Sequence, residues 1–173
     1  MPPDLAYIGL GANLGDRLAT LRAVTAAIAA GQLHGVALSR VSPVFETSPL
    51  GPARYPFLNA ALELTTDRRP EELLDLLLGL EQRHGRVRGD RWAPRTLDLD
   101  LLLILRGGAH LTHGTAKLTL PHPEIARRDF VLAPLAALAP ELLLHPHATV
   151  GELLAQIPAA QRTILKKIPD QLC

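Results

Sequence analysis

The chain has 173 residues, of which 47% are hydrophobic, 20% are charged and only 3% are aromatic, and its net charge is +1. These values are typical of a compact globule with an aliphatic core, and they exclude a disordered chain. So small a net charge gives no general attraction to nucleic acid or to an anionic membrane. We therefore predict a single domain over residues 1–173.

Cysteine usage and hydropathy indicate a cytoplasmic location. The only cysteine is Cys173, so no disulfide can form within the chain and no cysteine-rich metal site exists. Residues 1–7 lack the basic and apolar segments of a secretory signal. No run of about 18 uncharged apolar residues is present, because prolines interrupt the best candidate at residues 130–140. We expect a cytoplasmic protein.

The first part of the chain predicts a strand, a helix and two further strands. Residues 5–10 form a short apolar run that is typical of a buried strand. A polar, glycine-rich stretch then predicts a tight turn, with Gly9, Gly11, Asn13 and Gly15. Asp16 can cap a helix over residues 17–30. Residues 36–46 and 57–66 predict two paired strands, separated by a proline-containing loop.

The second part predicts a helix, a basic loop, a strand and further helices. Residues 70–84 begin with a proline and carry glutamates in the first turn, as helices do. A basic loop over 85–94 leads into a strand over 97–105, and a small hairpin and a short strand follow. Two more helices are expected at 130–138 and 150–157. The order β-α-β-β-α-β predicts an α/β (α+β) protein with a ferredoxin-like sheet, additional C-terminal helices and helices on both faces.

Two acidic residues stand out on the strand over 97–105. Alternate residues of a strand face the same side, so Asp98 and Asp100 share one face while Leu97, Leu99 and Leu101 face a core. Neighbouring carboxylates repel unless a cation lies between them, and Mg²⁺ typically binds one or two carboxylates together with substrate phosphates. The pair predicts a magnesium site, and the alternative is the polar face of an amphipathic strand.

Arginines gather immediately before this strand. They are Arg83, Arg86, Arg88, Arg91 and Arg95. Guanidinium groups fit phosphate oxygens with two donors each, and arginines beside metal-binding carboxylates indicate phosphoryl transfer. The alternative is a solvated loop whose arginines pair with carboxylates, but Asp90 is the only acid within it.

Other candidate residues are less specific. Trp92, the only tryptophan, lies in the basic loop, where it can stack on a flat ligand or simply hold the loop down. Asn59 can read the edge of a heterocycle, but spacing alone favours core packing for Asn59, Phe57 and Phe130. His122 lies between two prolines and can contact phosphate or serve as an ordinary turn residue.

Two common nucleotide-binding motifs are absent from the sequence. No Gly-Lys pair exists, which excludes a Walker A loop. The glycines that begin at Gly9 lack the third position of a dinucleotide fingerprint, and the turn into the helix explains them better. An RNA-binding module or a small-molecule sensor without turnover are the alternative functions. The first would need exposed aromatics on central strands, and the intact carboxylate pair argues against the second.

Six segments occur in the order found in a known family, at residues 7–15, 47–52, 57–60, 85–88, 91–100 and 120–124. The most specific is Arg-Trp-Ala-Pro-Arg-Thr-Leu-Asp-Leu-Asp at 91–100. With these segments the chain resembles the 6-hydroxymethyl-7,8-dihydropterin pyrophosphokinases of folate biosynthesis. The resemblance implies transfer of pyrophosphate from ATP to the pterin hydroxymethyl group, which gives the pterin diphosphate and AMP.

The same resemblance implies roles for individual residues. The catalytic residues would be Arg86, Arg95, Asp98 and Asp100, with two magnesium ions held by Asp98 and Asp100. The ATP-binding residues would be Glu81, Arg88, Arg95, Leu101, Lys117, Thr119, His122 and Arg128. The pterin-binding residues would be Thr47, Leu50, Phe57, Asn59, Trp92 and Phe130. It also implies a monomer whose partners are small molecules, without nucleic acid or membrane.

Overall fold

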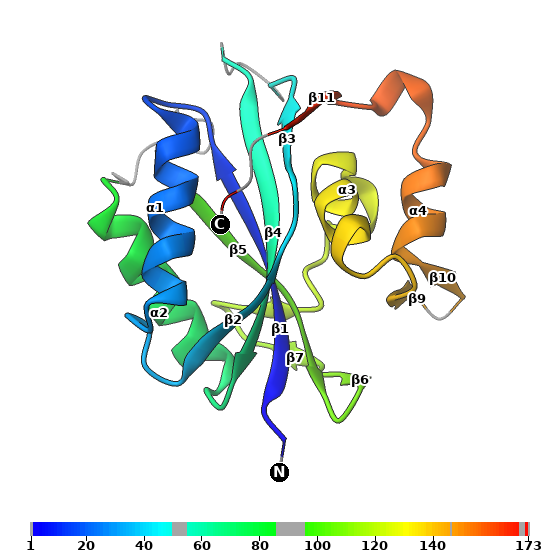
Figure 1. Cartoon of the computed structure of the whole chain (residues 1–173). Coiled ribbons are helices and arrows are strands. Elements are labelled where there is room, and N and C mark those ends of the chain that lie inside the picture. The colour runs from blue at the N-terminus through cyan, green and yellow to red at the C-terminus, as the bar shows by residue number, and fades with distance from the viewer. Residues whose placement is uncertain (1, 50–54, 86–95, 146, 170–171, 173) are drawn as a thin grey trace.

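The structure is a computed structural model, and it describes residues 2–49, 55–85, 96–145, 147–169 and 172 (Figure 1). Its centre is a seven-stranded sheet in which neighbouring strands are antiparallel. The strand order is β11-β3-β4-β1-β5-β6, and β2 also pairs with β4. The strands are β1 (Asp4–Ala12), β2 (Val36–Val41), β3 (Val44–Thr47), β4 (Phe57–Thr66), β5 (Asp98–Arg106), β6 (Ala109–His110) and β11 (Ile164–Ile168).

Helices cover both faces of this sheet, as predicted. Figure 1 shows α1 (Arg17–Ala29) and α2 (Pro70–Arg83) on one side, and α3 (Asp129–Leu138) and α4 (Val150–Gln156) on the other. Each side has its own aliphatic core, and Leu97, Leu99 and Leu101 belong to the core beneath α1 and α2. The predicted ferredoxin-like class, with its additional C-terminal helices, is confirmed.

Two small hairpins and two short helical turns complete the fold. The hairpins pair β7 (His113–Gly114) with β8 (Thr119–Leu120), and β9 (Leu143–His145) with β10 (Ala148–Thr149). The short turns are η1 (Ile125–Arg127) and η2 (Ala159–Gln161). Within the described ranges no helix is long and apolar enough to cross a membrane.

The helix ends follow the sequence signals. The Asp16 side chain accepts a hydrogen bond of 3.0 Å from the Ala19 N–H, which satisfies one of the unpaired donors at the start of α1. Pro70 occupies the first turn of α2, where its missing N–H costs no hydrogen bond. Both helices end just before a glycine with positive φ, Gly31 at 74° and Gly85 at 81°.

Two local predictions are wrong, and the strands β9, β10 and β11 were not predicted. Residues 36–46 form two strands, because Pro43 has no N–H for the ladder; beside it the Ser42 hydroxyl accepts a 2.8 Å hydrogen bond from the Ala61 N–H of β4. Gly9 and Gly11 lie within β1, so the turn does not explain them. The strand β11 was not predicted, because it depends on pairing with the distant edge strand β3.

Candidate active site

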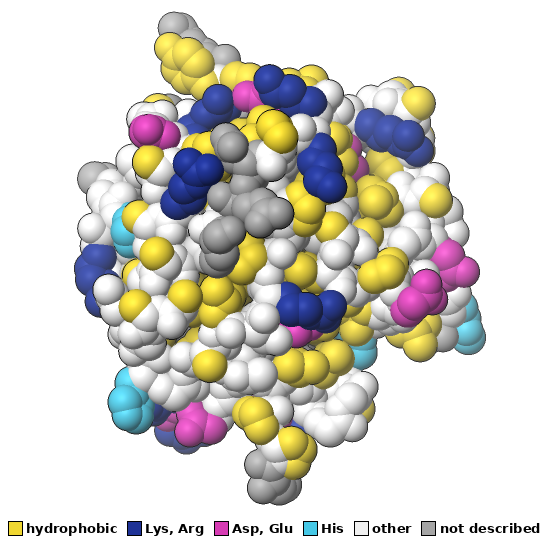
Figure 2. Space-filling model, viewed as in Figure 1, with side chains coloured by type: hydrophobic (Ala, Val, Ile, Leu, Met, Phe, Trp, Pro, Cys, Tyr) yellow, Lys and Arg dark blue, Asp and Glu magenta, His cyan; other side chains and the backbone are white. Residues whose placement is uncertain are grey.

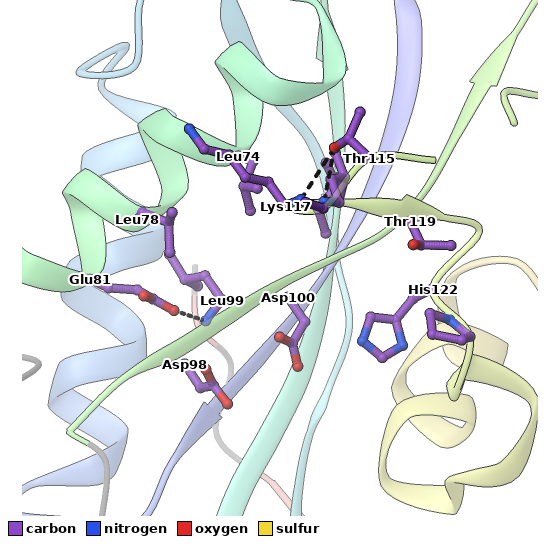
Figure 3. Close-up of a pocket in the computed structure, with 14 residues that line it drawn as sticks. Leu74, Leu78, Glu81, Asp98, Leu99, Asp100, Thr115, Lys117, Thr119 and His122 are labelled. Carbon is purple, nitrogen blue, oxygen red and sulfur yellow. Dashed lines mark hydrogen bonds between the residues drawn. The ribbon is translucent and has the colours of Figure 1, made fainter. Parts of the chain in front are cut away.

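The carboxylates of Asp98 and Asp100 lie at the start of β5, on the face of the sheet that α3 covers. Figure 3 shows both side chains on the same side of the strand, while Leu99 between them is buried on the opposite side. Farther along, a bulge opposite Tyr7 and Ile8 brings both Leu102 and Leu103 into the core under α3 and α4. The prediction that Asp98 and Asp100 share one face of the strand is confirmed. Beyond Leu101 that face is occupied by the core under α3 and α4.

Two glycines of the neighbouring strand β1 lie beside the carboxylates. In the sheet register Gly11 lies between Asp98 of β5 and Asn59 of β4, and Gly9 lies opposite Asp100. A Cβ atom on Gly11 would lie 3.2 Å from Asn59 Oδ1 and 3.8 Å from Asp98 Cβ. Because Gly11 has no side chain, only its backbone lies between Asp98 and Asn59 in the sheet.

Asn59 belongs to a second polar group, built from β3 and β4. Its Nδ2 donates a 2.7 Å hydrogen bond to Thr47 Oγ1, and both side chains are buried. Phe57 lies opposite Thr47 in the register, and its ring would come 3.9 Å from a Cβ on Gly11. Phe57, Asn59 and Thr47 thus form one contiguous group, next to the carboxylate end of β5.

Phe130 occupies the start of α3, the helix that packs against β3 and β4. It is half-buried, and the Arg128 guanidinium lies 5.8 Å from its ring centroid. At this distance the cation and the ring attract each other, which restrains both side chains. Phe130 is thus placed on an element that contacts both strands of the Asn59 group.

A cavity of about 370 Å³ runs along the open edge of β5 (Figure 3). It is lined by predicted ATP-binding and metal-binding residues, namely Glu81, Asp98, Asp100, Leu101, Lys117, Thr119 and His122. The structure therefore brings these residues together. Arg128 is not part of the lining and instead stands over Phe130.

Backbone groups at this edge are satisfied in two different ways. Glu81 is buried, and its Oε1 accepts a 2.7 Å hydrogen bond from the Leu99 N–H, which faces away from β1. Farther along the strand the His122 N–H donates to the Leu102 carbonyl at 2.7 Å. The cavity lies between these two points, so the open stretch of edge has room for a ligand that forms backbone hydrogen bonds.

His122 presents a neutral donor to the cavity. Its Nδ1 accepts a 3.2 Å hydrogen bond from the Glu124 N–H, so the ring proton resides on Nε2. Burial lowers the pKa of His122, and the positive charge of Arg128 lowers it further. The imidazole is therefore neutral near pH 7 and donates through Nε2, without adding a full charge to the site.

The loop of the β7–β8 hairpin carries Lys117 to the cavity, and α2 holds this loop. Thr115 Oγ1 donates to Glu71 Oε1 at 2.9 Å, and His113 Nε2 lies 3.6 Å from the same oxygen. The Thr115 hydrogen bond is the largest cause of the lowered pKa of Glu71. Neither Glu71 nor Thr115 was among the predicted site residues, because only the folded chain brings the hairpin onto the first turn of α2.

The carboxylate pair offers two oxygen-donor side chains to a metal ion. Within the described residues no group of three or more His, Cys, Asp or Glu side chains is placed to hold an ion. Two carboxylates on one face nevertheless fit Mg²⁺, which commonly takes one or two protein carboxylates and completes its shell with water and substrate phosphate oxygens.

Comparison with known proteins identifies the family. The sequence model of the 7,8-dihydro-6-hydroxymethylpterin-pyrophosphokinase family matches residues 7–140. The chain belongs to this family. It is 42% identical over 140 residues to the 2-amino-4-hydroxy-6-hydroxymethyldihydropteridine pyrophosphokinase of Bacillus subtilis, with 80% of each chain covered. It is also 42% identical over 153 residues to the enzyme of that name from Pseudomonas aeruginosa, covering 88% of this chain and 91% of the relative.

A solved structure supports the fold. The crystal structure of an HPPK-DHPS in complex with substrates matches 90% of this chain with a TM-score of 0.64 and 13% sequence identity. This chain spans 43% of the length of that solved chain. At such low identity the likeness concerns the fold alone, and it agrees with the ferredoxin-like class predicted from the sequence.

Five residues that the family resemblance selects lie outside the described part of the chain. They are Leu50, Arg86, Arg88, Trp92 and Arg95. Their roles stay predictions.

Sequence reasoning also missed Gly11, the residue that lies between the carboxylate pair and the Asn59 group. The register of β1 with β4 and β5 reveals that role, and no local pattern could have shown it.

Proposed function

We propose that this pyrophosphokinase-family protein transfers the pyrophosphoryl group of ATP to the hydroxymethyl oxygen of 6-hydroxymethyl-7,8-dihydropterin, with Asp98 and Asp100 holding magnesium. The observation that carries the proposal is the register of three strands. It places the carboxylate pair of β5 next to the Asn59 group of β4, with only Gly11 between them. A phosphate donor and a flat heterocyclic acceptor bound at these two groups would meet above β1.

ATP is proposed to occupy the cavity along β5. Its adenine can reach the open edge near Leu101, and its phosphates can reach Lys117, Thr119 and His122, which line the same cavity. Arg86, Arg88 and Arg95 are proposed as further phosphate ligands, on the family resemblance. Bound Mg²⁺ would neutralise phosphate charge beside Asp98 and Asp100. The resemblance also suggests two ions, a monomer and a cytoplasmic location, which stay predictions.

The dihydropterin is proposed to lie against Phe57 and Phe130, with its polar edge toward Asn59. The amide of Asn59 carries both a donor and an acceptor, which suits the paired nitrogens and oxygen of a pterin edge. The 2.7 Å hydrogen bond from Asn59 Nδ2 to Thr47 Oγ1 fixes the amide orientation, so Asn59 Oδ1 faces the floor at Gly11. Leu50 and Trp92 are proposed to complete the pocket.

The proposed reaction is a displacement at the β-phosphorus of ATP. A bond forms between the hydroxymethyl oxygen and this phosphorus, and the bond from the phosphorus to the oxygen that bridges the α- and β-phosphates breaks. AMP leaves with that oxygen, and the hydroxyl proton passes to solvent. Because the transition state is loose, the alcohol can lose its proton late, so positioning and charge neutralisation provide most of the acceleration.

The direct test is product analysis. Purified protein is incubated with ATP, magnesium and the reduced pterin alcohol, and the nucleotide products are separated by chromatography. The expected result is AMP and pterin diphosphate in equal amounts. Formation of ADP, or AMP release that does not depend on the pterin, would contradict the proposal. Omission of magnesium provides the control for the metal assignment.

A further inference from the structure

The segment at Thr163–Ile164 contacts both sides of the proposed pterin site. These residues lie beyond residue 140, where the family match ends. On one side they contact Asp129 at the start of α3, and on the other they contact Thr47 and Ser48 at the end of β3. This inference rests on the proposed function, because the two sides matter together only if a pterin lies between them.

Asp129 is the anchor on the helix side. It is 2% exposed, and three donors converge on its carboxylate. The Thr163 N–H donates to Oδ2 at 2.6 Å, the Thr163 hydroxyl donates to Oδ1 at 2.5 Å, and the Ile164 N–H donates to Oδ2 at 3.1 Å. Hydrogen bonds to a charged acceptor are stronger than neutral ones, and burial of this carboxylate requires them. Asp129 immediately precedes Phe130, so its position determines where α3 presents that ring.

The same two residues hold β3 on the other side. The Thr163 carbonyl accepts from the Ser48 N–H at 2.8 Å, and Ile164 pairs with Thr47 in the β11–β3 ladder. Thr47 in turn accepts the hydrogen bond from Asn59. A continuous chain of contacts therefore runs from Phe130 through Asp129 and Thr163 to the Thr47–Asn59 pair.

Close packing does not explain this connection. Asp129 and Ile164 border a cavity of about 440 Å³, together with Gly151, Leu154, Ala155 and Arg162. The segment therefore borders open space on that side, and the three hydrogen bonds to Asp129 join it to α3. Figure 1 shows the segment crossing from the α3–α4 side to β3 at one end of the sheet.

We propose that Asp129 and Thr163 are positioning residues for the pterin site, which fix the distance between Phe130 and the Thr47–Asn59 pair. Neither residue touches the reacting atoms. Their loss lets α3 and β3 move apart, and this weakens the binding of a flat ligand held between them. The cavity along β5 depends on α2, β5 and the β7–β8 hairpin, so ATP binding is unaffected.

The test compares four variants of the full chain. Asp129→Ala removes all three hydrogen bonds, and Thr163→Val removes only the hydroxyl donor at nearly constant volume. Thr163→Ser keeps that donor, and Glu141→Gln changes an exposed carboxylate after α3 and serves as the control. The dissociation constant of the dihydropterin is measured by equilibrium titration, and KM is measured separately for pterin and ATP.

We expect Asp129→Ala to weaken pterin binding about tenfold or more, and Thr163→Val about threefold, as for the loss of charge-assisted hydrogen bonds. Thr163→Ser and Glu141→Gln should match the wild type, and KM for ATP should stay within about twofold in all four. Should Asp129→Ala fail to fold, the Thr163→Val and Thr163→Ser pair decides alone.

Other outcomes overturn the inference. Lower stability toward urea with unchanged pterin affinity would show that Asp129 only stabilises the fold. Equal weakening of pterin and ATP binding would show a general distortion. A wild-type protein that binds pterin but releases no AMP would contradict the proposed function and leave the pterin titrations to decide the role of Asp129.

Discussion

Two acidic groups lie on the same face of the sheet, at opposite ends of α3, and they are surrounded very differently. Near the end of α3, Glu63 of β4 is enclosed by protein donors, namely the Tyr7 hydroxyl, the Ser39 hydroxyl and the Arg40 guanidinium. Near its start, Asp98 and Asp100 line an open cavity with Lys117 and His122. Three protein side chains donate to the Glu63 carboxylate, whereas Asp98 and Asp100 line a cavity that a ligand can fill.

The surroundings of Glu63 explain why it is structural. Arg40 also donates to the Leu138 carbonyl at 2.6 Å, so the cluster joins β2, β4 and the last turn of α3. The hydrogen bonds to Glu63, above all the one from Arg40, lower the pKa of Glu63 to about 2. Burial and the neighbouring Glu63 raise the pKa of Tyr7 to about 12. The Glu63 carboxylate is thus surrounded by donors of the protein itself, whereas the cavity at Asp98 offers side chains of both signs.

On the described part of the face drawn in Figure 2, the basic side chains do not form the groove that an RNA-binding module would need. On the face drawn in Figure 2, the coloured Lys and Arg side chains stand as separate patches among apolar and acidic groups. Single-stranded RNA binding needs a continuous basic groove with stacking aromatics. The large hydrophobic side chains that are exposed in the described residues are Tyr55, Leu143 and Leu165, and only Tyr55 is aromatic.

The largest effect is expected at the ligand-facing acids. Asp98→Asn or Asp100→Asn should lower kcat by roughly 100-fold or more, because each variant removes charge that balances metal and phosphate during transfer. Stability toward urea should change little, because neither side chain belongs to the two hydrophobic core clusters. AMP release and urea unfolding measure the two quantities. Turnover near the wild-type rate at moderate magnesium would contradict the metal assignment.

The enclosed acid should behave in the opposite way. Glu63→Gln should retain kcat and lose about 2 kcal/mol of unfolding free energy, less than for a fully buried pair because the Arg40 side chain is about half exposed. The folded pKa of Glu63 lies below its usual value of 4.5, so its contribution to stability is present above pH 4.5 and is lost as the pH falls toward 2. Urea unfolding at pH 7 and pH 3 should show this loss for the wild type and a smaller one for the variant.

Gly11 lies between the two proposed substrates, so a side chain added there tests whether the pterin binds beside it. In Gly11→Ala the new methyl lies 3.2 Å from Asn59 Oδ1, which displaces the amide, whereas Gly9→Ala meets its nearest atom at 3.6 Å, an ordinary contact. We expect KM for pterin to rise about tenfold for Gly11→Ala and at most about twofold for Gly9→Ala. Similar effects of both variants would exclude Gly11 as the pterin floor.

The difference between the two acidic groups also shows what the sequence could predict. The shared face of Asp98 and Asp100 follows from strand periodicity, which is a local rule, and the structure confirms it. The Glu63 cluster combines residues from three separate segments, Tyr7, Ser39–Arg40 and Glu63. No pattern of residue spacing in the sequence could predict such a cluster. The long strands at residues 4–12, 57–66 and 98–106 were predicted, but the break at Pro43 was not, and the strands β9, β10 and β11 were missed because they depend on pairing with other strands.

The same distinction explains which site residues could be inferred. The spacing of Asp98 and Asp100, together with the basic loop before them, was enough to predict metal and phosphate binding from the sequence alone. On the pterin side, spacing favoured core packing for Phe57 and Asn59, and only the family resemblance selected them. The structure shows why, since Asn59 is buried like a core residue and the register with Gly11 alone reveals its place beside the carboxylates.

The smallest effect is expected at His122, where the charge state of the cavity is tested. If neutral Nε2–H donates to phosphate, His122→Gln keeps a neutral donor and should raise KM for ATP by about twofold, while His122→Ala should raise it about fivefold. Because burial and Arg128 lower its pKa, the imidazole gains a proton only below its usual range, and ATP binding through this residue should be constant from pH 7 to 8. A loss of wild-type ATP affinity over this interval that His122→Gln abolishes would instead show that the charged imidazolium binds the phosphates. In that case the positive charge facing Asp98 and Asp100 would include His122 as well as Lys117.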